Sequence, residues 1–93
     1  MKKDYQMQDF WLYCAQIQKE VAQEVLDQVT EDESWRCART ITDYMFNLRA
    51  MHLDRIWAMN RSGNPYVGLI NEALKKHNIF ISECYIHISN IGL

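Results

Sequence analysis

Glycine and proline are absent from the first 62 residues of this 93-residue chain. All three glycines and the single proline come later, beginning with Gly63. These two residue types are the ones that most strongly interrupt helices and strands. Their absence predicts long, uninterrupted helices in the part of the chain before Gly63.

Membrane and export signals are missing as well. No stretch approaches the ~18 consecutive apolar residues of a membrane span, and Met1 is not followed by an apolar run of the signal-peptide type. The three cysteines, Cys14, Cys37 and Cys84, are odd in number and far apart, which does not indicate a disulfide framework. We expect reduced thiols, a cytoplasmic location and no contact with a membrane.

Signatures of catalysis are also lacking. The chain has no glycine-rich phosphate loop, no Gly-x-Ser-x-Gly nucleophile elbow and no His-Glu-x-x-His zinc motif. Cys84 and His87 have a Cys-x-x-His spacing, but a structural zinc site normally needs a second close pair of ligands. We therefore expect no enzyme, no metal site and no cofactor.

The overall composition is that of a small globular protein. Hydrophobic residues make up 48% of the chain, which argues against disorder and for one domain over residues 1–93. The net charge is -2, whereas nucleic-acid and anionic-membrane binders are usually clearly basic. The charges are segregated, because all five arginines lie between residues 36 and 61.

The first predicted helix covers residues 5–28. Its apolar residues recur at steps of three or four, the spacing of one helical face. That face consists of Phe10, Cys14, Ile17, Val21 and Val25. Thr30 and Glu33 then have the spacing of a capping box, so a tight turn should join this helix to an antiparallel neighbour.

The second predicted helix covers residues 31–60 and is apolar on two opposite sides. At about 1.5 Å per residue it would be roughly 45 Å long. One stripe is Cys37, Ile41, Tyr44, Met45, Leu48, His52, Ile56 and Met59. The other contains Trp35, Phe46, Ala50, Leu53 and Trp57. A single partner helix cannot cover both stripes, so apolar surface should remain.

A shorter third helix is predicted over residues 65–77. Asn64 suits its N-cap, Pro65 suits its first turn, and Asn78 suits a left-handed stop. The tail over residues 79–93 is rich in isoleucine and favours a strand, although a helical stripe also fits it. As a strand it must pair with itself, with a second copy or with a partner. The predicted fold is therefore mainly α, with a C-terminal tail that is β in one of two readings.

Two surfaces are candidates for partner binding. Tryptophan and arginine dominate interface hot spots, which points to the second stripe and the arginines beside it. The residues of that candidate surface are Trp35, Arg39, Phe46, Arg49, Leu53 and Trp57. An acidic second contact consists of Glu20, Glu24, Asp27, Glu31, Asp32 and Glu33. Each candidate has a purely structural alternative. The third helix and the tail could cover the second stripe as ordinary core, and the acidic residues could simply form a solvent-exposed turn.

These features favour a non-catalytic protein that regulates or inhibits a macromolecular partner. We expect the partner to be a protein rather than a nucleic acid. We also expect the chain to form a homo-oligomer, with a dimer preferred. Small acidic proteins of this kind include inhibitor, immunity and anti-defence proteins of bacteria and phages. One alternative is a DNA- or RNA-binding regulator whose dimer gathers the arginines. Another is a nucleotide sensor or sponge, with Tyr44, His52 and Tyr66 lining a pocket.

Overall fold

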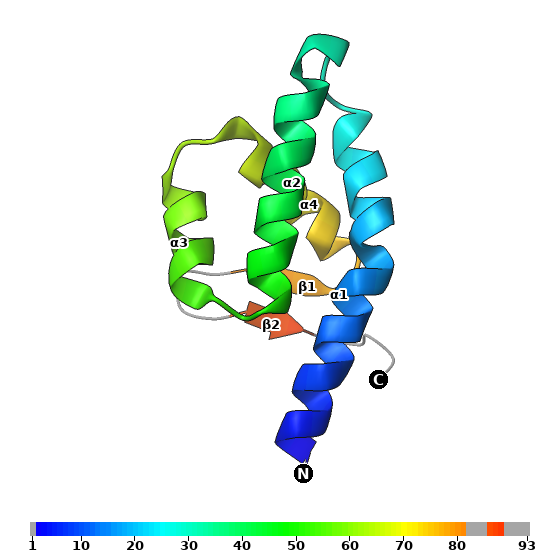
Figure 1. The fold of residues 1–93 in the computed structure, drawn as a ribbon, viewed down its shortest axis with the longest axis vertical. Coiled ribbons are helices and arrows are strands. Elements are labelled where there is room, and N and C mark those ends of the chain that lie inside the picture. Colours follow the sequence, from blue (N-terminus) through cyan, green and yellow to red (C-terminus); the bar gives the residue numbers. More distant parts are fainter. Residues whose placement is uncertain (1, 82–85, 89–93) are drawn as a thin grey trace.

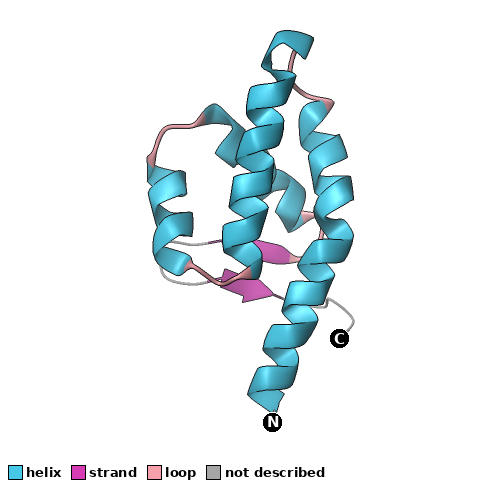
Figure 2. Cartoon of the chain, viewed as in Figure 1, coloured by secondary structure: helices cyan, strands magenta, loops and turns pink. Residues whose placement is uncertain are grey.

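The computed structural model describes residues 2–81 and 86–88, and the side chains of residues 9–81. Four α-helices and a short 3-10 turn precede a two-stranded hairpin (Figures 1 and 2). The elements are α1 (Lys2–Leu26), η1 (Glu31–Glu33), α2 (Ser34–Arg49), α3 (Leu53–Arg61), α4 (Pro65–Lys75), β1 (Ile79–Ile81) and β2 (Ile86–Ile88). The protein is mainly α, as predicted.

Helix α2 occupies the centre of the molecule. In Figure 1 it runs antiparallel to α1 on one side and to α3 on the other, and α4 crosses behind it. The antiparallel pair expected from the tight turn is therefore present. Its entry differs in detail, because the side chain of Thr30 makes no capping bond and Ser34 Oγ instead donates to the Thr30 carbonyl at 3.3 Å.

The predicted continuous helix over residues 31–60 is wrong, because the chain breaks after Arg49. Met51 adopts a φ of 60°, in the left-handed region. The N–H of Met51 donates to the Leu48 carbonyl at 3.0 Å, and the N–H of His52 donates to the Asn47 carbonyl at 2.9 Å. These two bonds form a Schellman C-cap, whose left-handed position is usually glycine. A methionine fills it here, so the absence of glycine did not reveal the break.

The break lets α3 fold back along α2 and bury residues that a straight rod would leave outside the core. Ile56 is only 1% exposed. Burying an isoleucine side chain is worth about 1.5–3 kcal/mol. A left-handed non-glycine residue costs about 1–2 kcal/mol. The gain from Ile56 and its neighbours therefore exceeds the strain at Met51.

Buried Asn47 stabilises the turn that follows α2. Its Nδ2 donates to the Asp43 carbonyl at 3.0 Å, and its Oδ1 lies 3.3 Å from His52 Nδ1. His52 itself is exposed, although the sequence pattern placed it in the buried stripe. The prediction that His52 is buried was wrong because it assumed that the helix continued through residue 52, whereas the chain breaks after Arg49.

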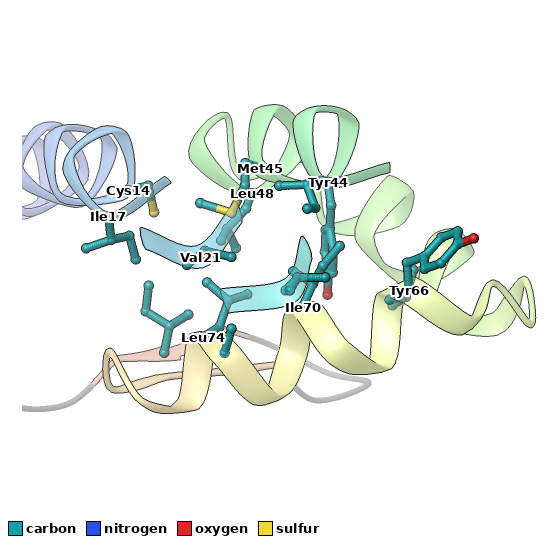
Figure 3. Packing of buried hydrophobic residues seen from close by; sticks show 14 of the residues in the cluster. Cys14, Ile17, Val21, Tyr44, Met45, Leu48, Tyr66, Ile70 and Leu74 are labelled. Carbon is teal, nitrogen blue, oxygen red and sulfur yellow. The ribbon is translucent and has the colours of Figure 1, made fainter. Parts of the chain in front are cut away.

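One hydrophobic core joins α1, α2 and α4 (Figure 3). The predicted apolar face of the first helix is buried there, as are five residues of α4 and the α2 part of the stripe that begins at Cys37. The α2 contribution is Cys37, Ile41, Tyr44, Met45 and Leu48. The second stripe is not covered in this way, and its exposed residues shape the candidate site.

The start of α4, the left-handed residue that follows it and the pairing of the tail agree with the sequence prediction. Asn64 Oδ1 accepts a hydrogen bond of 2.8 Å from the Tyr66 N–H, Pro65 begins α4, and Asn78 has a φ of 65°. Strands β1 and β2 pair antiparallel, with Ile79 opposite Ile88. The tail therefore pairs with itself, which was one of the three arrangements open to a strand.

Candidate functional site

The solvent-facing side of α2 carries large side chains that the molecule does not cover. Trp35 is 63% exposed and Phe46 is 54% exposed. Helical spacing places both on one side of α2, together with Arg39. We call the exposed set Trp35, Arg36, Arg39, Thr42, Asp43 and Phe46 the α2 face.

A groove of about 760 Å³ runs beside the α2 face. Its lining is Arg36, Arg39, Thr40, Thr42, Asp43, Phe46, Met59 and Asn64. Two contacts fix the opposite wall, because Asn64 Nδ2 lies 3.4 Å from Thr40 Oγ1 and Met59 Sδ lies 4.0 Å from Asn47 Nδ2. The lining thus combines two apolar side chains, Phe46 and Met59, with two arginines, Arg36 and Arg39.

Each of the three tryptophans carries an arginine over its ring. The Cζ atom of Arg36 lies 5.9 Å from the Trp35 ring centroid. Corresponding distances are 4.9 Å for Arg49 over Trp11 and 5.5 Å for Arg61 over Trp57. Within about 6 Å, a guanidinium is attracted to the face of an aromatic ring. These contacts hold the planar cations close to exposed apolar surface.

The six residues of the predicted partner surface do not form one continuous face. Arg49 turns toward α1, where it stacks on Trp11, and its buried Nε has no hydrogen-bond partner among the side chains that the structure describes. Leu53 and Trp57, 36% and 37% exposed, lie on α3 and do not line the groove. The turn after α2 separates them from Trp35, Arg39 and Phe46.

The arginine-bearing third of the chain, residues 34–64, has an excess of positive charge. Residues 34–64 contain five arginines but only two acids, Asp43 and Asp54. None of the arginines forms an ion pair with any residue that the structure describes. Four of the arginines are exposed, so their charges are available to groups outside the chain, whereas Arg49 is held against Trp11.

The acidic candidate set is divided between two environments. Glu24 pairs with Lys76 at 2.7 Å, and Glu20 lies 3.7 Å from His77, so the end of α4 neutralises part of α1. A shallow hollow of about 630 Å³ contains Glu20, Gln23, Glu24, Asp27, Gln28 and Lys76. Glu31, Asp32 and Glu33 are exposed on η1. The sequence pattern did not predict this contact between α1 and the end of α4.

Three polar side chains form a closed ring of hydrogen bonds that sequence reasoning missed. Tyr44 Oη donates to Asn71 Oδ1 at 2.7 Å, Asn71 Nδ2 donates to Asn60 Oδ1 at 2.7 Å, and Asn60 Nδ2 donates to Tyr44 Oη at 2.9 Å. Burial raises the pKa of Tyr44 to about 12, against the opposing effect of the two asparagines. The ring links α2, α3 and α4.

The pocket proposed for a nucleotide sensor is not assembled from its predicted residues. Tyr44 and Tyr66 are buried, whereas His52 is exposed beside the Schellman turn. The groove offers a different set of residues to a small ligand, because Arg36 and Arg39 line it together with Phe46 and Met59.

Cys14 is a core residue and has no reactive surroundings. Burial raises the pKa of its thiol to about 12, although the charge of Arg49 opposes this shift. The Cys84 and His87 pair lies outside the side chains that the structure describes. Over the described ranges, no helix is long and apolar enough to cross a bilayer. Comparisons with protein-family models, curated proteins and solved structures found no match to this chain.

Proposed function

We propose that this chain is a non-catalytic binding protein that regulates or inhibits a macromolecular partner, as a homo-oligomer in the cytoplasm. The observation that carries the proposal is the set of arginines beside exposed tryptophans that have no carboxylate partner among the described residues. Tryptophan and arginine are the residues most enriched among interface hot spots. Inhibitor, immunity and anti-defence proteins of bacteria or phages are the functional types that this arrangement suits.

The chemistry of the surface favours an acidic protein partner. A guanidinium stacked on an indole keeps its N–H groups directed outward, where they can donate two hydrogen bonds to one carboxylate. Arg61 over Trp57 offers that geometry on α3, and exposed Leu53 lies on the same helix. A partner that presents aspartate or glutamate beside an apolar side chain would meet both requirements.

The proposal is tested by capture of partners in the native host cells, with the tagged chain and two matched double variants. Trp57→Ala with Arg61→Ala removes the α3 pair. Leu12→Ala with Lys19→Ala removes one exposed apolar and one exposed cationic side chain from α1. A partner held by the wild type and the α1 control, but lost from the α3 variant, supports the proposal. Equal capture by all three proteins contradicts it.

A nucleic-acid partner is a second candidate, because phosphates would also accept the unpaired guanidiniums. Its affinity would fall steeply with added salt, since each neutralised phosphate releases a counterion. Fluorescence anisotropy with labelled duplex DNA and single-stranded RNA tests this directly. Absence of binding at low salt excludes the candidate.

A nucleotide is a third candidate, because the groove combines Arg36 and Arg39 with Phe46 and Met59. Guanidiniums suit phosphates, and the apolar end suits a base. A thermal-shift screen with nucleoside mono-, di- and triphosphates tests it, and a flat response excludes it.

A further inference from the structure

We infer that a second copy of this chain occupies the α2 face and its groove, with the two α2 helices antiparallel about a two-fold axis at the level of Ile41. This inference rests on the homo-oligomer of the proposed function and names its interface. The α3 pair of Trp57 and Arg61 is left free for a foreign partner.

The first reason is a pair of opposite charges that do not meet within one chain. Arg39 and Asp43 lie one helical turn apart, and both are exposed. Among the described residues they form no ion pair, and the only side-chain contact of Asp43 is with Asn47 Nδ2 at 3.5 Å. Each charge therefore has room for a partner from outside the chain.

The second reason is that the α2 face is complementary to itself. In an antiparallel helix pair related by a two-fold axis, a residue before the axis lies opposite one equally far after it. An axis at Ile41 places Arg39 opposite Asp43 of the partner subunit, and the symmetry repeats the contact. Two ion pairs then form at once, without like charges in register.

The third reason is the position of the aromatic side chains at the two ends of the face. Trp35 and Phe46 are separated by roughly 16 Å along α2. The two-fold operation brings Trp35 next to Phe46 of the partner subunit, and Arg36 next to the same ring. The groove beside Phe46, about 760 Å³ in volume, provides the space for the incoming indole. Aromatic pairs and Arg–aromatic contacts both stabilise such an interface.

Charge reversal tests this register specifically. Sedimentation velocity over a range of concentrations should give the wild type twice the 11.1 kDa mass of one chain. Arg39→Asp or Asp43→Arg alone places like charges opposite each other twice, and each should raise the dimer Kd by about tenfold or more. The double variant restores opposite charges and should return the Kd to within about threefold of wild type.

Circular dichroism controls for folding, because both residues are exposed and neither contributes to the core. A wild type that stays monomeric at every concentration overturns the inference. So does a dimer that neither single reversal weakens, or one that the double variant does not restore. A monomeric wild type would also remove the homo-oligomer from the proposed function, whereas a dimer that does not respond to charge reversal would leave it in place. None of these results affects capture of a foreign partner through Trp57 and Arg61, so the binding of that partner is tested separately.

Discussion

The hydroxyl of Tyr44 donates a hydrogen bond of 2.7 Å to the side-chain oxygen of Asn71. Through Asn60 the same hydroxyl is tied to α3. One buried phenol thus connects three helices. The contact stabilises α3 in its folded-back position.

Tyr44→Phe should destabilise the protein by about 1–3 kcal/mol, because it removes one donor and one acceptor and leaves the Asn71 oxygen without its partner. Urea unfolding followed by circular dichroism measures the change. Tyr13→Phe is the matched control, because it loses only the 3.0 Å bond to the His77 carbonyl. An equal or larger loss in the control would contradict the importance assigned to the ring.

Stability should fall in alkaline solution. Burial raises the pKa of Tyr44 from 10.0 to about 12 and that of Cys14 from 9.0 to about 12. A group whose folded pKa is raised contributes fully below its unfolded pKa and loses that contribution as pH rises toward the folded value. The free energy of unfolding should therefore be constant up to about pH 9 and decline toward pH 12.

The pH effect is measured by urea unfolding at successive pH values. Tyr44→Phe with Cys14→Ala removes both groups, so its decline over the same range should be clearly shallower than that of the wild type. If the two proteins have parallel profiles, the alkaline loss arises from other groups.

Met51 should respond to substitution through its backbone. Met51→Gly and Met51→Ala both lose the partly buried side chain, but only glycine adopts a φ of 60° without steric cost. The glycine variant should therefore be more stable than the alanine variant by about 1 kcal/mol. Thermal unfolding of the two variants checks this, and an alanine variant of equal stability would argue against the left-handed turn.

Ile56→Ala should release α3 from the core more than it affects the rest of the protein. Removal of a fully buried isoleucine side chain costs about 2–5 kcal/mol. Hydrogen exchange should show lost protection in α3 before α2. Leu53→Ala, at a residue 36% exposed on the same helix, is the control and should cost less. Equal effects would mean that α3 does not dock through Ile56.

The predictable parts of the fold are those determined by local chemistry. Asn64 and Pro65 mark the start of α4 because capping depends on neighbouring residues only, and Asn78 takes the predicted left-handed conformation shortly after α4 ends at Lys75. The break at Met51 was not predictable in this way. Its cause is tertiary, because the burial of Ile56 outweighs a backbone conformation that methionine disfavours.

The candidate site was predictable in composition but not in arrangement. Exposure of Trp35 and Phe46 follows from a helix that is apolar on two sides, and both are exposed. The position of Arg49 over Trp11 required knowledge of how α1 and α2 cross. The ring of Tyr44, Asn60 and Asn71 left no sequence pattern, since its members lie on three separate helices.

The fold-back after α2 also has a consequence for the order of folding. Helices α2 and α3 are joined by a very short connection, so their docking closes a small loop and costs little chain entropy. Docking of α1 on α4 brings together Tyr13 and His77, which are 64 positions apart. Helices α1 and α2 are also joined by a tight turn, so we expect both neighbouring pairs to assemble early and the contact between α1 and α4 to form last.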